Sequence, residues 1–186
     1  MISHEHKFIF VRIPKTASTS IINALYRECG KMEGHENHED INYYIRKYSN
    51  VHDYFKFTFV RNPWELRYSY YFYNKNLPGR HGKYARNLSL KDWILRYSGK
   101  NSQVRRTQLE FVGGNINNMD FIGKFETLQE DFNIICDKIG IPRQELPHKN
   151  KSTRKHYTEY YDDETRQIVA EKFAKDIEYF GYEFGK

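Results

Sequence analysis

The chain has 186 residues, 39% of them hydrophobic, and no apolar run approaches the roughly 18 residues that a membrane-spanning helix needs. This length predicts one domain, residues 1–186, because two independent cores need a longer chain. The 30 basic and 24 acidic residues give a net charge of +6 and a mixed surface, which leaves nucleic acid, anionic sugar polymers and phosphorylated cofactors open as partners. The start "MISHEHKFIF" lacks an export pattern, so we expect a cytoplasmic protein or a domain of a membrane-anchored one.

Apolar periodicity indicates alternating strands and helices. In chain order it predicts strand Lys7–Ile13, helices Ser18–Cys29 and Glu39–Tyr48, strand Phe55–Arg61, helices Pro63–Asn76 and Leu90–Tyr97, strand Phe121–Phe125, and helices Thr127–Ile139 and Asp163–Phe180. The segment "NKNLPGRHGKYARN" is expected to be irregular. This alternation favours an α/β fold with a parallel sheet covered on both faces, in which ligands bind beyond the carboxyl ends of the strands.

The two cysteines lie far apart, each on the apolar face of a predicted helix. We therefore expect Cys29 and Cys136 to be reduced core thiols instead of a disulfide or a functional site.

The segment "PKTASTS", Pro14–Ser20, follows the first buried strand and leads into a helix. A helix N-terminus has unpaired N–H groups and partial positive charge, which suit a phosphate or a sulfate. Lys15 adds a movable charge, and hydroxyl donors stand at Thr16, Ser18, Thr19 and Ser20. The GxxxxGK[ST] pattern of nucleotide-triphosphate loops is absent, as is an obvious acidic strand end for magnesium. The spacing alone equally allows Ser18 to be a helix cap and Lys15 to be merely solvated.

A second anion site is predicted at the end of the next strand. In "FKFTFVRNPWELRYSYYFY" the strand ends at Arg61, Pro63 opens a helix, and Ser69 lies about two turns on. Because a guanidinium offers a bidentate fork, Arg61 and Ser69 can hold a phosphate from two directions. Two such sites predict one ligand with two separated anionic groups.

These two segments resemble the cofactor signatures of the sulfotransferases that use 3'-phosphoadenosine 5'-phosphosulfate. The likeness is to the carbohydrate O-sulfotransferase branch, which includes heparan sulfate 2-O- and chondroitin-type enzymes. It continues through "FIGKFETLQEDF", "LPHKNKST" and "YYDDETRQIVAEKFAKDIEYFGYEF" and so covers nearly the whole chain. It departs where the family has an arginine three residues before the helix serine, since this chain has Leu66 there and Arg67 next.

The resemblance implies a single sulfotransferase domain, residues 1–186, with a P-loop NTPase-like three-layer fold, its central parallel sheet flanked by helices. It implies in-line transfer of a sulfuryl group to an acceptor hydroxyl, with 3'-phosphoadenosine 5'-phosphate as product. The loop Lys15–Ser20, Ala17 included, would hold the 5'-phosphosulfate, and Arg61 with Ser69 the 3'-phosphate. Lys15 would stabilise charge on the bridging oxygen, as cations do in phosphoryl transfer, and no metal is required.

The acceptor hydroxyl needs a base, which "GHENHEDINYYI" can supply. In the branch that the chain resembles, the base is a histidine about two dozen residues upstream of the strand-end arginine, and His38 has that place. Such a base contributes about 10²–10⁴-fold in rate. His35 is the alternative base, and His38 could instead merely flank the helix. A metal site of both histidines with acidic neighbours is a weaker alternative, because no further ligand pattern accompanies them.

The remaining basic segments carry less specific predictions. "NKSTRKHY" resembles a loop that folds over the cofactor, which implies contacts from Lys151, Ser152 and Arg154; a solvated basic loop is the alternative. The segment Arg80–Arg86, with Arg105 and Arg106, is a candidate groove for an anionic glycan or a solvated face.

We expect a hydroxyl-bearing acceptor, with a carbohydrate as the first candidate, and no nucleic-acid partner. Oligomeric state and the modified hydroxyl do not follow from the sequence. One rival is a P-loop-type kinase of a small molecule, which the missing GxxxxGK[ST] disfavours. The other is a non-catalytic polyanion- or nucleic-acid-binding module, which is disfavoured because the distinctive residues cluster at two strand ends.

Overall fold

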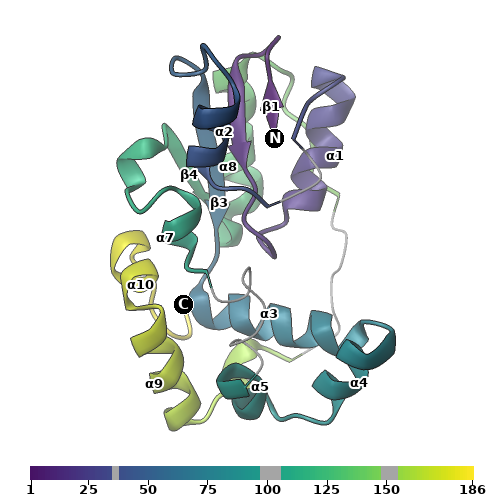
Figure 1. Ribbon diagram of the computed structural model, residues 1–186, viewed down its shortest axis with the longest axis vertical. Coiled ribbons are helices and arrows are strands. Elements are labelled where there is room, and N and C mark those ends of the chain that lie inside the picture. Colours follow the sequence, from purple (N-terminus) through teal and green to yellow (C-terminus); the bar gives the residue numbers. More distant parts are fainter. Residues whose placement is uncertain (35–37, 97–105, 148–154) are drawn as a thin grey trace. The chain divides into compact units, whose positions relative to one another are not determined.

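The computed structural model describes residues 1–34, 38–96, 106–147 and 155–186, and its chain forms two compact units (Figure 1). Unit 1 contains Met1–Arg61 and Gln108–Lys151, and unit 2 contains Asn62–Thr107 and Ser152–Lys186. In the described ranges, unit 1 holds the β-sheet and unit 2 is built from helices. Within these ranges no helix has the length and apolar character needed to span a membrane.

The described sheet has four strands in the order β1-β2-β3-β4, at Ile2–Ser3, Phe8–Val11, Phe55–Val60 and Phe121–Lys124. Strands β2, β3 and β4 are parallel, with Phe10 opposite Phe57 and Phe59 opposite Gly123. The predicted parallel pairing is therefore confirmed for β2, β3 and β4. Strand β1, which was not predicted, pairs antiparallel with β2, so the whole described sheet is mixed. The turn at residues 4–7 folds the chain start back on β2, and a two-residue strand is too short to leave a periodic pattern.

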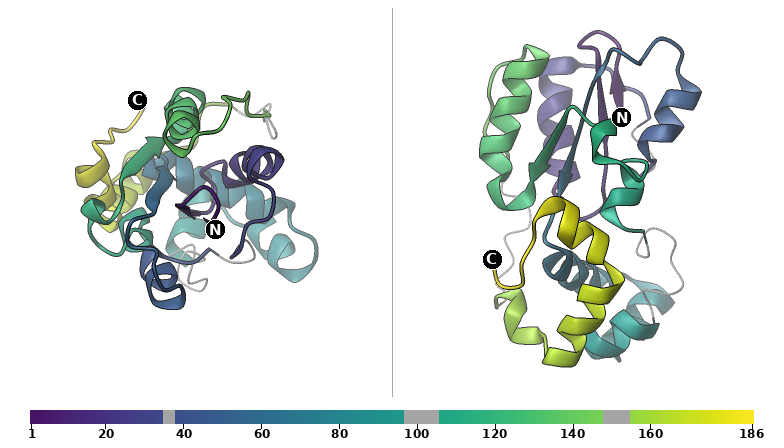
Figure 2. Two further views of the ribbon diagram at one scale, coloured as in Figure 1. Left: turned by 90° about the horizontal axis from the view of Figure 1, so that it is seen from above. Right: turned by 90° about the vertical axis from the view of Figure 1, so that its left-hand side faces the viewer.

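Helices lie on both faces of this sheet. Helices α1 (Ser18–Cys29) and α8 (Leu128–Ile139) cover one face, where their apolar residues pack with Phe8, Phe10, Phe57 and Phe59. Helices α2 (Ile41–Lys47) and α7 (Gln108–Phe111) lie on the other face (Figure 2). The α/β prediction is therefore confirmed. Short 3-10 turns occupy Ile116–Asn118 and Phe125–Thr127.

The prediction for the two cysteines is confirmed. Cys29 on α1 and Cys136 on α8 are both free and buried in this core. Burial raises the pKa of the Cys29 thiol to about 11, so the thiol stays protonated at neutral pH.

Unit 2 packs its helices around aromatic side chains that include Trp64, Tyr71, Trp93 and Phe173. Its elements are α3 (Pro63–Asn76), α4 (Gly79–Arg86), α5 (Leu90–Arg96), the 3-10 turn Tyr157–Tyr160, α9 (Asp163–Lys172) and α10 (Ala174–Phe180). The predicted single helix at 163–180 is interrupted at Phe173, whose φ of −116° and ψ of 26° leave the helical region. This break lets the Phe173 ring enter the core with 1% exposure.

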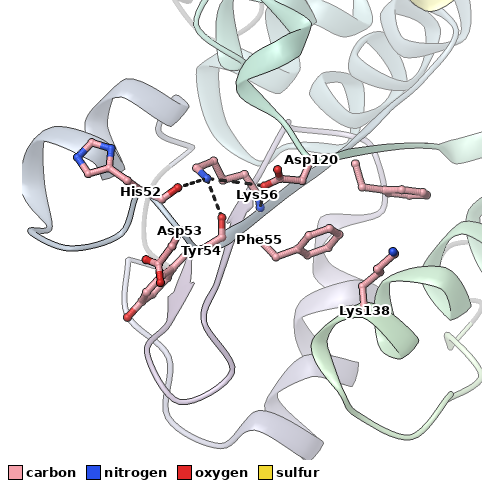
Figure 3. A pocket seen from close by; sticks show the side chains of 8 residues that line it. His52, Asp53, Tyr54, Phe55, Lys56, Asp120 and Lys138 are labelled. Carbon is pink, nitrogen blue, oxygen red and sulfur yellow. Dashed lines mark hydrogen bonds and ion pairs between the residues drawn. The ribbon is translucent and has the colours of Figure 1, made fainter.

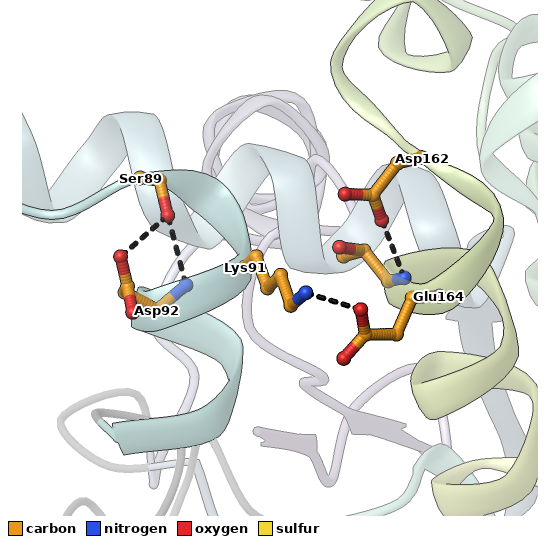
Figure 4. Close-up of polar contacts among 6 residues, drawn as sticks. Ser89, Lys91, Asp92, Asp162 and Glu164 are labelled. Carbon is orange, nitrogen blue, oxygen red and sulfur yellow. Dashed lines mark hydrogen bonds and ion pairs between the residues drawn. The ribbon is translucent and has the colours of Figure 1, made fainter.

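Polar contacts fix the starts of α5 and α9 (Figure 4). The Ser89 hydroxyl accepts the Asp92 N–H at 3.0 Å and donates to the Asp92 carboxylate at 2.8 Å. The Asp162 carboxylate accepts the Thr165 N–H at 2.7 Å. Lys91 forms an ion pair with Glu164, so the first turns of the two helices are also joined to each other.

The segment predicted to be irregular forms α4, because Gly82 allows this helix to turn back against the end of α3. A Cβ at Gly82 would stand 1.7 Å from the Leu77 carbonyl oxygen.

We therefore expect Gly82→Ala to lower the free energy of unfolding by about 1–3 kcal/mol, the usual cost of overpacking. Urea denaturation followed by circular dichroism measures this loss. The exposed neighbour Lys83 supplies the control, since Lys83→Ala should stay within about 0.5 kcal/mol of wild type. Equal stability of Gly82→Ala and Lys83→Ala would contradict the close packing of Gly82 against the Leu77 carbonyl oxygen.

Candidate functional site

The loop Pro14–Ser20 connects the exit of β2 to the start of α1 and has a strained backbone. Lys15 and Ala17 have φ angles of 69° and 62°, in the left-handed region that costs a residue with a Cβ about 1–2 kcal/mol. Such strain gathers at ligand-binding sites, and left-handed residues among ordinary ones turn successive N–H groups toward a common concavity that suits an anion. Ala17 is the N-cap of α1 and Ser18 is already helical, so the alternative that Ser18 caps the helix is wrong.

Some side chains of this loop form hydrogen bonds that hold its shape, and others are accessible to solvent. Thr16 is fully buried, and its hydroxyl donates to the Ile13 carbonyl at 2.9 Å. The Ser20 hydroxyl donates to the Pro147 carbonyl at 3.2 Å. Ser18 is buried, whereas Thr19 is exposed and Lys15 is half-buried. Thr16 and Ser20 therefore hold the loop in shape, and Thr19 and Lys15 are the side chains with access to solvent.

Arg61 follows β3 directly and reaches this loop. Its Nη1 donates to the Lys15 carbonyl at 3.0 Å, and its Cζ lies 3.7 Å from the centre of the Phe125 ring. The Gln108 side chain pairs with the Arg61 backbone, accepting its N–H at 2.8 Å and donating to its carbonyl at 2.8 Å. The structure thus brings together the two predicted anion-binding elements of unit 1, the Lys15 loop and the strand-end arginine.

His38 lies against the same strand exit. Its Nδ1 is 2.9 Å from the Arg12 carbonyl oxygen, three residues before Lys15 in the chain. A carbonyl only accepts hydrogen bonds, so Nδ1 carries a proton, and in the neutral imidazole Nε2 is then the acceptor. Burial lowers the His38 pKa below the ordinary 6.5 and the positive charge of Arg12 lowers it further, although the hydrogen bond to the Arg12 carbonyl opposes them. A neutral imidazole with Nε2 as acceptor has the form that a general base needs.

Comparison with known proteins decides the family. A family model described as the sulfotransferase family matches residues 1–183. The chain belongs to the sulfotransferase family. An uncharacterized protein from Archaeoglobus fulgidus is 30% identical over 94 residues, which are 49% of this chain and 72% of that protein. No solved structure matches the chain. Family membership makes sulfuryl transfer the class of reaction that this sulfotransferase performs.

Ser69 and Arg67 of the sulfotransferase lie in unit 2. Ser69 is half-buried on α3, and its contact with a 3'-phosphate stays a prediction. Arg67 is 1% exposed, and its Cζ lies 4.2 Å from the Phe173 ring centre and 5.1 Å from that of Tyr70. Arg67 therefore belongs to the core of unit 2 and does not present its guanidinium at the surface next to Leu66.

Some predicted residues of the sulfotransferase lie outside the described ranges: His35, Arg105, Lys151, Ser152 and Arg154. Their roles stay predictions. Sequence reasoning also missed side chains that shape the site, namely Arg12, Gln108 and Phe125. Gln108 stands 47 positions from Arg61, and no short motif marks a contact over such a separation.

A hollow of about 450 Å³ lies at the amino ends of β3 and β4 (Figure 3). Its lining residues are His52, Asp53, Tyr54, Phe55, Lys56, Asp120, Phe121 and Lys138. The Lys56 ammonium donates to the His52 carbonyl at 2.8 Å and the Tyr54 carbonyl at 2.7 Å, and it pairs with Asp120 at 3.7 Å. Because the strands are parallel, this hollow is at the opposite end of the sheet from the Lys15 loop and is no part of the site. Within the described ranges no group of three or more His, Cys, Asp or Glu side chains could hold a metal ion.

Proposed function

We propose that this sulfotransferase moves the sulfuryl group of 3'-phosphoadenosine 5'-phosphosulfate to a hydroxyl of a carbohydrate, by in-line displacement with His38 as the base. The observation that carries the proposal is the 3.0 Å hydrogen bond from Arg61 to the Lys15 carbonyl. It places a guanidinium beside a strained helix-start loop, and a nucleotide with anionic groups on both the 3' and 5' sides needs two neighbouring cationic sites. The donor set of this edge, with cations and backbone N–H groups, fits such a nucleotide.

The loop and the histidine take different parts in the proposed reaction. Lys15 holds its ammonium where negative charge develops on the leaving oxygen, and a cation already in place there lowers the barrier. The N–H groups at the start of α1 hold the 5' end. His38 accepts the proton of the acceptor hydroxyl at Nε2, and the Arg12 carbonyl keeps the imidazole ring in the required tautomer.

The charge distribution supports an anionic carbohydrate as the acceptor class. Unit 1 has 14 Lys and Arg against 14 Asp and Glu, whereas unit 2 has 16 against 10 and so carries the whole net charge. Residues 68–90 contain four Lys and Arg and no Asp or Glu. On α4, Arg80, Lys83 and Arg86 are exposed together with Tyr84, and a tyrosine ring is a good platform for a sugar face.

Nucleotide binding is the direct test. The thermal shift of the protein with 3'-phosphoadenosine 5'-phosphate is compared with that for ADP and for ATP with magnesium. A ligand at a hundred times its Kd stabilises the native state by about 2.7 kcal/mol, which is visible as a higher melting temperature. Selective stabilisation by the 3'-phosphorylated nucleotide supports the proposal, and transfer of labelled sulfate to a panel of anionic and neutral glycans then tests the acceptor. Stabilisation by ATP with magnesium alone contradicts it and favours a kinase.

The Arg61 side chain provides a separate prediction. We expect Arg61→Ala to weaken binding of 3'-phosphoadenosine 5'-phosphate by about 2 kcal/mol or more, because a charge-assisted hydrogen bond is lost. Isothermal titration calorimetry measures the effect, with the exposed Arg46 on α2 as the control in Arg46→Ala. An unchanged Kd for Arg61→Ala would remove Arg61 from the nucleotide site.

A further inference from the structure

Gln108 uses its side chain as a neighbouring strand would use its backbone. It is the first residue of α7, is 1% exposed, and pairs with both the N–H and the carbonyl of Arg61 at 2.8 Å each. The β3–β4 register ends with Val60 opposite Lys124, so Arg61 is the first residue past that ladder. An amide edge carries one donor and one acceptor, like a peptide group. The Gln108 side chain therefore extends the hydrogen-bonded part of β3 by one residue.

This pairing fixes the backbone from which the arginine side chain departs. At its other end, the guanidinium lies on the Phe125 ring and donates to the Lys15 carbonyl. An arginine side chain has many rotamers, and less conformational entropy is lost on binding when its planar fork is already oriented. Gln108 holds the root of the side chain, Phe125 supports the head, and the Lys15 carbonyl sets its direction.

We propose that Gln108 is a positioning residue that orients Arg61 for recognition of the nucleotide 3'-phosphate. The proposal rests on the proposed function, in which Arg61 holds that phosphate. Gln108 acts through the Arg61 backbone and touches no part of the nucleotide. Its effect therefore concerns how well the protein distinguishes a nucleotide with a 3'-phosphate from one without it.

A buried glutamine that only stabilised the fold would affect all nucleotides alike, so the test measures a ratio. Gln108→Met keeps the length of the side chain and removes both hydrogen-bonding groups. Calorimetry gives the Kd for 3'-phosphoadenosine 5'-phosphate and for adenosine 5'-monophosphate, which lacks the 3'-phosphate. We expect the first Kd to rise about tenfold and the second by less than about twofold, since a charge-assisted contact is misaligned in one case only. In an Arg61→Ala background, Gln108→Met should then change neither Kd, because the two residues act as one unit.

Controls separate this effect from a general loss of packing. Asn118 donates from its side-chain amide to the Val112 carbonyl at 2.8 Å, so Asn118→Leu removes a comparable bond in unit 1 and should keep the wild-type ratio. Hydrogen exchange of the unliganded protein gives a readout without nucleotide, in which the Arg61 amide should exchange faster in Gln108→Met than in wild type. If Gln108→Met does not fold, the shorter Gln108→Asn, which cannot reach both backbone groups, takes its place.

The possible failures are distinguishable. Equal binding of the two nucleotides by the wild-type protein overturns the proposed function and, with it, the role of Gln108. A wild-type preference that Gln108→Met leaves unchanged, either because neither Kd changes or because both Kd values rise by the same factor, overturns the role of Gln108 alone. An additional effect of Gln108→Met in the Arg61→Ala background has the same meaning.

Discussion

Lys15→Ala is expected to lower kcat for sulfuryl transfer by at least about 100-fold, because a cation in place at the leaving oxygen contributes to the transition state and not to the ground state. The fold should persist. Alanine and lysine face the same cost at a φ of 69°, and the backbone carbonyl that receives the Arg61 N–H remains after the substitution. Single-turnover kinetics with labelled nucleotide measure the rate, and circular dichroism checks the fold.

A second variant at the same position separates charge from strain. Glycine adopts the left-handed region without steric cost, so Lys15→Gly should be stabilised by about 1 kcal/mol and yet be as inactive as Lys15→Ala. The exposed Lys31, just after α1, provides the control in Lys31→Ala, which should retain wild-type kcat. A Lys15→Ala protein with kcat close to wild type would show that the ammonium takes no part in the chemistry.

His38→Ala is expected to lower kcat/KM by at least about 100-fold, within the range that a general base contributes. The wild-type pH profile carries a second mark of this role. A base must be neutral to accept a proton, and since the His38 pKa lies below 6.5, more than half of the imidazole is neutral at pH 6.5. The acidic limb of kcat/KM should therefore fall below pH 6.5, and activity should decline as the pH decreases through that limb.

The measurement is kcat/KM across the acidic and neutral range for wild type, His38→Ala and a control. His52 is an exposed histidine at the opposite end of the sheet, so His52→Ala should keep both the rate and the acidic limb. In His38→Ala the limb should disappear together with most of the rate. An intact limb in that variant would assign the base to another residue.

The sequence predicts the parts of this site that depend on parallel strands. Lys15 and Arg61 each follow a buried, β-branched or aromatic strand, and the carboxyl ends of parallel strands share one edge of a sheet, so their proximity follows from pattern alone. The role of Gln108 cannot be predicted from the sequence, because a side-chain amide that replaces a strand partner leaves no periodicity.

The helix α4 was not predicted for a different reason. Gly79 and Gly82 count as breakers in a propensity argument, yet here Gly82 is the residue that permits the tight packing of α4.

The break between α9 and α10 and the orientation of His38 also could not be predicted from sequence patterns. The apolar stripe of 163–180 is continuous, and the interruption at Phe173 becomes visible only when the ring is seen to enter the core beside Arg67. His38 could be selected only through the family resemblance. What orients it is a backbone carbonyl, the Arg12 oxygen, and such an acceptor has no sequence signature.

The left-handed residues of the Lys15 loop have a thermodynamic consequence. A loop that reaches these angles with glycine samples many conformations when empty and loses that freedom on binding. Lys15 and Ala17 carry β-carbons, and Thr16 is anchored to Ile13, so this loop has few conformations to lose. Its cost is incurred when the chain folds and is not repeated each time an anion binds. In the proposed reaction, turnover then proceeds on a preformed loop whose backbone needs no reordering between one nucleotide and the next.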